Sequence, residues 1–171
     1  MTCDLSELII CLITAFAMLG NVVQAEVSAR AKVLYEQEIS EMIQDSDVTL
    51  LARLVWGEAR GLSTTEQAAV IWCVLNRVDA GYADGTIRGV VTAKGQFTGY
   101  HSSNPVTDFH RDLAIDVLSR WYREQHGETD VGRVLPPEYL YFAGSGGHNW
   151  FRPAYKSSVR WDWSLPSPYD D

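Results

Sequence analysis

The sequence has 171 residues, enough for one ordinary domain, and 46% of them are hydrophobic, so the chain can form a buried core. The formal net charge is −8, with 22 acidic against 14 basic residues. This balance excludes a nucleic-acid binder that works by neutralising phosphates, which needs an excess of Lys and Arg. The three cysteines form no C-x-x-C pair, so the sequence indicates neither a disulfide framework nor a zinc site.

The first 25 residues are predicted to be a signal peptide or a membrane anchor. Leu8–Val23 is a mostly apolar run, and Val23-Gln24-Ala25 resembles the small-x-small site that signal peptidase cuts. The run is shorter than the roughly 20 residues that span a bilayer. In addition, Asp4 and Glu7 stand where a signal peptide usually carries basic residues. A buried core helix is therefore the alternative interpretation.

The rest of the chain is predicted to be a linker or weak helix over residues 26–47 and one mainly α domain over residues 48–171. Helical spacing of apolar residues predicts long helices that end at Gly61, near Gly81 and before Gly127. Ser63 and Glu66 form an S-x-x-E capping pair for the second of these helices, and Thr107 is predicted to be the N-cap of the third. The inner face of the third helix is predicted to hold Phe109, Leu113, Val117, Leu118 and Trp121.

Smaller elements are expected between and after the long helices. A short helical turn is predicted over residues 86–91, with a small hairpin near Gln96-Phe97. The alternation in Tyr139–Phe142 predicts a short strand, and residues 144–147 (G-S-G-G) predict a flexible loop. This loop lacks the glycine spacing of a phosphate-binding motif, and the four histidines lack the spacing of metal ligands, so we expect neither a cofactor nor a metal.

Glu58 is the residue that does not suit an ordinary amphipathic helix. The spacing that buries Leu51, Leu54 and Val55 also turns Glu58 inward. A carboxyl group held in an apolar wall loses hydration, which favours its protonated form, and a protonated carboxyl can donate to a leaving oxygen. Cleavage of a glycosidic bond needs such an acid. The alternative is a structural ion pair between Glu58 and one of the arginines Arg53, Arg60 and Arg77.

Aromatic residues gather near the end of the chain and suggest a sugar-binding surface. Eight of them lie between Tyr139 and Trp163. Flat rings with polar edges suit sugar faces, although ordinary core packing is expected to account for about half of them. Among the histidines, His148 is the best placed to line a groove.

Several short motifs together resemble the spore cortex-lytic type of cell wall hydrolase family. The match begins with L-A-R-L-V-W-G-E-A-R-G over residues 51–61 and continues with Q-A-A-V (67–70), V-L-N-R-V (74–78) and G-Q-F (95–97). Tyr141-Phe142 corresponds to a late aromatic strand. The resemblance covers roughly residues 50–152, and its motifs are jointly specific although each alone is weak.

The resemblance implies a lysozyme-like fold, mainly helical with a small β element beside a groove. It also implies cleavage of peptidoglycan between N-acetylmuramic acid and N-acetylglucosamine, with Glu58 as the general acid. Because the matched segments contain no second acid, a lytic transglycosylase-like reaction is favoured over simple hydrolysis. Candidate substrate-binding residues are Gln67, Gln96, Phe97, Tyr141, Phe142 and His148.

The resemblance also implies a protein exported to the periplasm, the cell wall or the medium and acting on glycan strands. The acidic net charge predicts no nucleic-acid partner. Contact with a membrane is expected only through a possible N-terminal anchor, and we expect a monomer. The departure at Leu62, where the family often has an acidic residue, leaves open whether the substrate is spore cortex or vegetative wall. Two other functions remain: a peptidoglycan-binding module without turnover, and a membrane-anchored structural protein.

Overall fold

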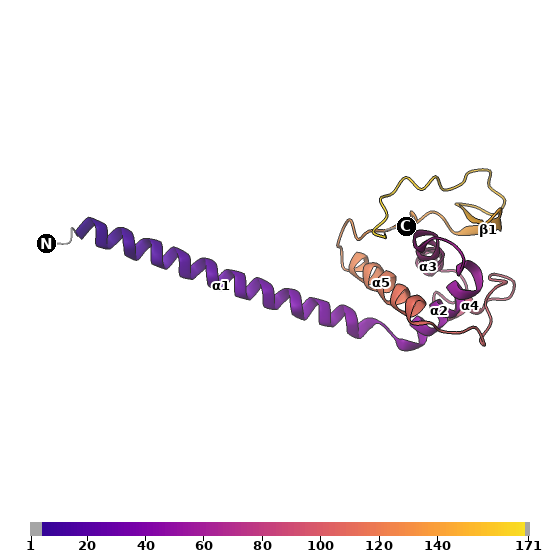
Figure 1. Cartoon of the computed structure of the whole chain (residues 1–171), viewed down its shortest axis with the longest axis horizontal. Helices are drawn as coiled ribbons and strands as arrows, with labels where there is room; N and C mark the ends of the chain where they lie inside the picture. Colours follow the sequence, from indigo (N-terminus) through magenta and orange to yellow (C-terminus); the bar gives the residue numbers. More distant parts are fainter. Residues whose placement is uncertain (1–4, 170–171) are drawn as a thin grey trace. The chain divides into compact units, whose positions relative to one another are not determined.

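The computed structural model describes residues 5–169, with side chains from residue 21 onward, and divides into two compact units, residues 1–41 and 42–171. The described residues of the first unit all belong to one continuous helix, α1 (Leu5–Met42) (Figure 1). In the part of the chain that is described, no helix has both the length and the apolar character needed to cross a membrane. The predicted signal peptide or anchor falls largely on residues 1–4 and on the side chains of residues 5–20. These lie outside the described set, so it stays a prediction.

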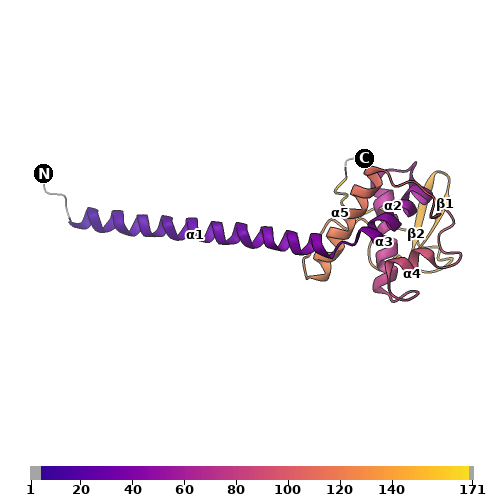
Figure 2. The ribbon, with the colours of Figure 1, turned by 90° about the horizontal axis from the view of Figure 1, so that it is seen from below.

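The second unit contains four helices and one β-hairpin, which confirms the predicted mainly α class with a small β element. Figure 2 shows the two strands of the hairpin running beside each other next to the helices. The elements are α2 (Asp45–Ala59), α3 (Thr64–Asp79), α4 (Ile87–Thr92), α5 (Asp108–Gln125), β1 (Tyr141–Ser145) and β2 (His148–Arg152).

Helix α3 is the centre of the core. Twelve consecutive residues, Glu66–Arg77, are buried, so this helix is covered on all sides and not on one face only. The predicted caps are present: the Ser63 hydroxyl accepts from the Glu66 amide at 3.2 Å, and the Thr107 hydroxyl accepts from the His110 amide at 3.3 Å. Side-chain caps of this kind satisfy amides that the first turn of a helix leaves free.

Two local predictions were wrong. Phe109 was placed on the inner face of α5 but is 48% exposed, because His110 occupies the buried position beside it. No strand forms near Gln96-Phe97 in the described chain; Phe97 is buried and its ring lies 5.9 Å from that of Phe142.

The hairpin is antiparallel and its turn is tight. Tyr141 pairs with Arg152 at the open end, and Ser145 pairs with His148 next to the turn. Gly146 and Gly147 have φ of 64° and 80°, as a two-residue type I′ turn requires, and glycine adopts such angles without strain. The residues predicted to be a flexible loop are therefore the end of β1 and this turn.

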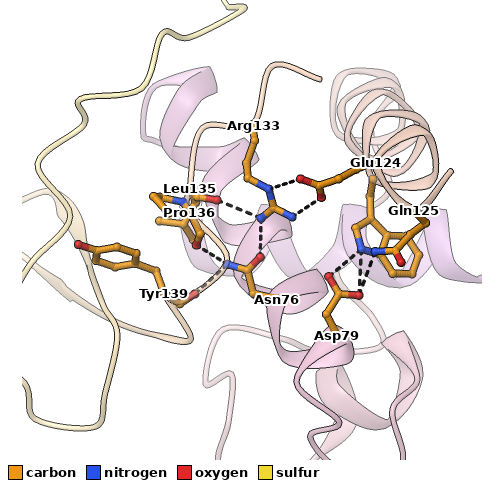
Figure 3. A network of polar contacts seen from close by, with 9 residues as sticks. Asn76, Asp79, Glu124, Gln125, Arg133, Leu135, Pro136 and Tyr139 are labelled. Atoms are coloured by element: carbon orange, nitrogen blue, oxygen red, sulfur yellow. Dashed lines mark hydrogen bonds and ion pairs between the residues drawn. The ribbon is translucent and has the colours of Figure 1, made fainter. Parts of the chain in front are cut away.

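The N-R pair of the V-L-N-R-V motif attaches the segment before the hairpin to α3, and Figure 3 shows the contacts of its first residue, Asn76. Asn76, which is 1% exposed, donates to the carbonyls of Pro136 (2.8 Å) and Tyr139 (3.0 Å) and accepts from Arg133 at 2.6 Å. The next residue, Arg77, donates to the Leu140 carbonyl at 2.6 Å. These bonds place β1 relative to the central helix.

Replacing Asn76 should lower stability much more than replacing a residue at the exposed end of the same network. Asn76→Ala removes the side-chain partner of the Pro136 and Tyr139 carbonyls and one of the partners of Arg133, so we expect the free energy of unfolding to fall by about 2–4 kcal/mol. Gln125, which contacts Asp79 at the surface, is the matched control. Gln125→Ala should change the free energy of unfolding by less than about 0.5 kcal/mol. Urea titration measures both; equal effects would contradict the anchoring role.

His110 should make the fold sensitive to mild acid. Burial lowers the pKa of His110 below its ordinary value of 6.5, so the unfolded chain binds a proton more readily than the folded one. Its contribution to stability is therefore present above about pH 6.5 and is lost as the pH falls below that value. The drop in free energy of unfolding from pH 7.5 to pH 5 should be smaller in His110→Gln than in the unmodified protein; an unchanged drop would contradict this assignment.

Candidate functional site

A cleft of about 510 Å³ lies between the end of α2 and the turn of the hairpin. One wall is formed by residues 57–62 and the other by residues 144–149. Glu58 is half-buried in the first wall and is the only acidic residue that lines the cleft within the described chain. The inward turn predicted for Glu58 thus brings its carboxyl group to an open cavity large enough for a ligand.

The Glu58 carboxyl group is held by a backbone amide. The Gly99 N–H donates to Glu58 Oε1 at 2.6 Å, and Oε2 has no hydrogen-bond partner among the described residues. None of the arginines considered as ion-pair partners contacts it: Arg53 donates to the Asn104 carbonyl, Arg60 to the Trp56 carbonyl and Arg77 to the Leu140 carbonyl. The structural ion pair is therefore the wrong interpretation of this glutamate.

Two glycines allow the Gly99 amide to reach Glu58. A Cβ added to Gly57 would lie 1.9 Å from the Gly99 carbonyl oxygen, and one added to Gly99 would lie 2.5 Å from the Gly57 carbonyl oxygen. Neither position tolerates a side chain, because both contacts are with backbone atoms that cannot move aside. The glycine that precedes Glu58 in G-E-A-R-G is thus explained by close backbone packing.

Asn104 fastens the same loop to α2. Its side chain, in a residue that is 8% exposed, donates to the carbonyls of Arg53 (3.0 Å) and Gly99 (2.8 Å). In return, Arg53 donates from Nε to the Asn104 carbonyl at 3.2 Å. Hydrogen bonds in both directions between Asn104 and Arg53 therefore hold the loop that carries the Gly99 amide against α2.

Glu66 and Asn149 position the opposite wall of the cleft. Glu66 is only 8% exposed. Its carboxylate accepts a hydrogen bond from the backbone amide of Asn149 at 3.1 Å and lies 3.3 Å from Nδ1 of His148. The Asn149 side chain in turn approaches the Glu58 carbonyl at 3.5 Å. The start of β2 is therefore held against both α3 and the residue that lines the other wall.

The predicted substrate-binding residues do not all face one cavity. His148 lines the cleft, whereas Gln96, Tyr141 and Phe142 line a separate hollow of about 370 Å³ at the other end of the hairpin. Gln67 and Phe97 are buried, at 5% and 8% exposure. Gln67 donates to the carbonyl of Leu62, a residue of the cleft wall, so this side chain supports the wall from behind.

Four residues that position the site were not singled out as site residues from the sequence: Glu66, Gly99, Asn104 and Asn149. Glu66 was assigned to a capping pair, and Ser63 does cap the helix, but the Glu66 side chain is used at the hairpin, 82 residues away from its partner His148. Glu66 stands in the first turn of α3 between Thr65 and Gln67, where an acidic residue is ordinary, so the local sequence gives no signal of its distant partners. Gly99 and Asn104 lie in the Gly-rich loop, where spacing alone does not indicate a partner.

No metal centre is indicated in the described part of the chain. It contains no group of three or more His, Cys, Asp or Glu side chains arranged to hold a metal ion. Cys73 is completely buried in the core, and burial raises the pKa of its thiol to about 12.

Comparison with known proteins assigns the family. The model of the cell wall hydrolase family matches residues 61–152, more than half of the chain, and the chain belongs to this family. The spore cortex-lytic enzyme of Oceanobacillus iheyensis is 30% identical over 79 residues, which cover 44% of this chain and 29% of that protein. This chain thus matches less than a third of the relative's length. Glu58 precedes the segment that the family model matches. No solved structure matches the chain.

A methyl group at Gly57 should disrupt the contact that holds Glu58. We expect Gly57→Ala to lower the free energy of unfolding by about 1–3 kcal/mol and to shift the NMR signal of the Gly99 amide. Gly61 is the matched control, because it lies on the same wall and a Cβ there meets no atom within 4 Å. Gly61→Ala should leave stability and the Gly99 signal nearly unchanged; the same result for Gly57→Ala would refute close packing at this point.

Proposed function

We propose that this protein cleaves the glycan strands of peptidoglycan between N-acetylmuramic acid and N-acetylglucosamine, with Glu58 as the catalytic residue. The main support is the arrangement of the Glu58 carboxyl group. One oxygen accepts a hydrogen bond from the Gly99 amide, and the other has no hydrogen-bond partner in the described chain. Glu58 itself lines an open cleft. Membership of the cell wall hydrolase family and the name of the spore cortex-lytic relative agree with this substrate.

The proposed reaction uses Glu58 twice. In the first step, protonated Glu58 donates to the glycosidic oxygen while the bond between this oxygen and muramic C1 breaks. In the second step, the muramic C6 hydroxyl attacks C1 and gives its proton to the Glu58 carboxylate, so the enzyme returns to its starting state. The products are a strand ending in a 1,6-anhydro sugar and a strand with a free N-acetylglucosamine hydroxyl.

Glu58 is the only acid that lines the cleft among the residues that the structure describes, which supports this lytic transglycosylase-like reaction over a mechanism with two carboxylates. Glu66, the nearby buried acid, is engaged with the Asn149 amide and the His148 ring. Hydrolysis, in which water replaces the C6 hydroxyl in the second step, is the close variant. The fixed position of Glu58 is important in either case, because general acid catalysis depends on the alignment of the proton with the leaving oxygen.

Other parts of the proposal concern the chain around the site. His148 is proposed to contact the sugar bound in the cleft, since its side chain is 61% exposed beside Glu66. Residues 48–171 are proposed as the catalytic domain of a monomeric protein that is exported to reach its substrate.

Glu58→Gln should abolish glycan cleavage while the fold stays intact. The amide cannot donate an acidic proton, so we expect release of soluble fragments from purified peptidoglycan to fall at least about a hundredfold. Glu138→Gln, an exposed acid far along the chain, is the charge-matched control and should retain activity. Circular dichroism checks the fold. Undiminished cleavage by folded Glu58→Gln would remove the assignment of this residue.

The ends of the released fragments separate the two reactions and the alternative without catalysis. Mass spectrometry of fragments made by the unmodified protein should show anhydro-muramic ends, because the C6 hydroxyl is the expected nucleophile. Reducing muramic ends would indicate hydrolysis. Binding without release of any fragment would instead support a peptidoglycan-binding module.

A further inference from the structure

The hollow at the open end of the hairpin concentrates positive charge in an acidic protein. Its lining includes Arg77 from α3, Arg152 from the end of β2 and Lys156 from the following loop, and no acidic residue of the described chain lines it. We call this hollow of about 370 Å³ the basic hollow. Three of the 14 basic side chains therefore meet in one place, although the chain carries 22 acidic ones.

None of these three cations forms an ion pair with a described residue, whereas Arg111, Arg120 and Arg133 all do. Arg152 is half-buried, and its Nε is buried without any hydrogen-bond partner among the described residues. Arg77 uses Nε on the Leu140 carbonyl and one terminal nitrogen on Gln96, at 3.3 Å. Gathering like charges without counter-charges is unfavourable, so an anion bound here would gain both charge pairing and hydrogen bonds.

Two of the three cations lie in secondary-structure elements, so their positions are fixed without a ligand. Arg77 is buried in the central helix, and Arg152 pairs across the hairpin with Tyr141. The Arg77 guanidinium lies 4.8 Å from the ring centre of Phe97 and 5.6 Å from that of Tyr141, which restricts its orientation. A preformed arrangement of donors costs less ordering entropy on binding than mobile surface side chains do.

Consecutive residues of β1 line the basic hollow and the cleft. Ala143 lines the hollow, and the next residue, Gly144, lines the cleft. The strand from Tyr141 to Ser145 rises about 3.3 Å per residue, so the two cavities are within the reach of one short oligosaccharide with its side groups. A ligand bound at Glu58 and extended along the hairpin would thus bring a substituent to the cations.

We propose that the basic hollow binds a carboxylate on the muramic acid side group, so that the protein selects glycan strands by their anionic substituents. The inference rests on the proposed function, because it assumes a peptidoglycan strand in the cleft. Muramic acid carries a lactyl ether whose carboxyl group is either free or joined to a peptide that ends in carboxylates. N-acetylglucosamine carries no such group, and planar guanidinium groups pair well with carboxylates.

Binding measured without turnover tests this selection. The full chain carrying Glu58→Gln is titrated by calorimetry with soluble peptide-bearing glycan fragments, with the same fragments stripped of peptide by an amidase, and with the neutral N-acetylglucosamine tetrasaccharide. Adding Arg152→Gln and Lys156→Gln should weaken binding at least tenfold for one of the two anionic ligands, the peptide-bearing or the stripped fragments. Affinity for the neutral tetrasaccharide should change less than twofold.

The matched control removes two other exposed positive charges, with Arg88→Gln and Arg160→Gln in the same background, and should change affinity less than twofold. If the lactyl carboxylate is the ligand, only the stripped fragments, in which this carboxyl group is free, will lose affinity. If the peptide carboxylate is the ligand, only the intact fragments will. Lys156→Gln alone, at an exposed position, provides a milder variant should the double variant lose its thermal transition.

Three results would overturn the selection by charge. They are no loss of affinity in the hollow variants, equal loss for charged and neutral ligands, and no measurable affinity for either the peptide-bearing or the stripped fragments before the hollow is changed. These outcomes are distinct from failure of the proposed function. Cleavage by the protein with Glu58 intact, or its absence, is read from fragment release and does not depend on the basic hollow.

Discussion

The contact between two backbone segments, at Gly57 and Gly99, is the constraint on which the site depends. Because neither residue has a side chain, the loop approaches α2 closely enough for its amide to bind the Glu58 carboxyl group. Asn104 then fastens the loop to α2 through two backbone carbonyls. The carboxyl group is thereby held at the cleft by backbone atoms, which have far less conformational freedom than a long charged partner would have.

The second wall of the cleft is placed by the central helix. Asn76 and Arg77 fix the segment that enters β1, while Glu66, near the other end of α3, fixes the start of β2. Both strands of a short hairpin, which would be marginal alone, are thus tied to a helix that is buried on all sides. The same helix contributes Arg77 to the basic hollow, so α3 positions residues of both the cleft and the hollow.

Patterns local in sequence predicted the parts of the structure that depend on local physics. Helical spacing indicated the long helices and turned Glu58 inward, and Ser63 and Thr107 cap their helices as expected. What the sequence could not show is which distant groups meet. Glu66 fitted a local capping pattern, yet its carboxylate accepts a hydrogen bond from the backbone amide of Asn149. Gly57 and Gly99 meet although α3 and α4 lie between them in the sequence. Arg77, Arg152 and Lys156 converge from a helix, a strand and a loop. Phe97 looked like a sugar platform because aromatic rings suit both sugars and cores, and here the core contains it.

The position of a bound glycan relative to residue 58 tests the central claim most directly. A crystal structure of Glu58→Gln with a soluble peptidoglycan fragment would show this position without turnover. We expect a bond between muramic acid and N-acetylglucosamine to lie in the cleft, with its glycosidic oxygen within about 2.6–3.2 Å of the side-chain amide of residue 58. A fragment bound elsewhere on the protein, with the scissile oxygen remote from residue 58, would contradict the assignment of Glu58 as the catalytic acid.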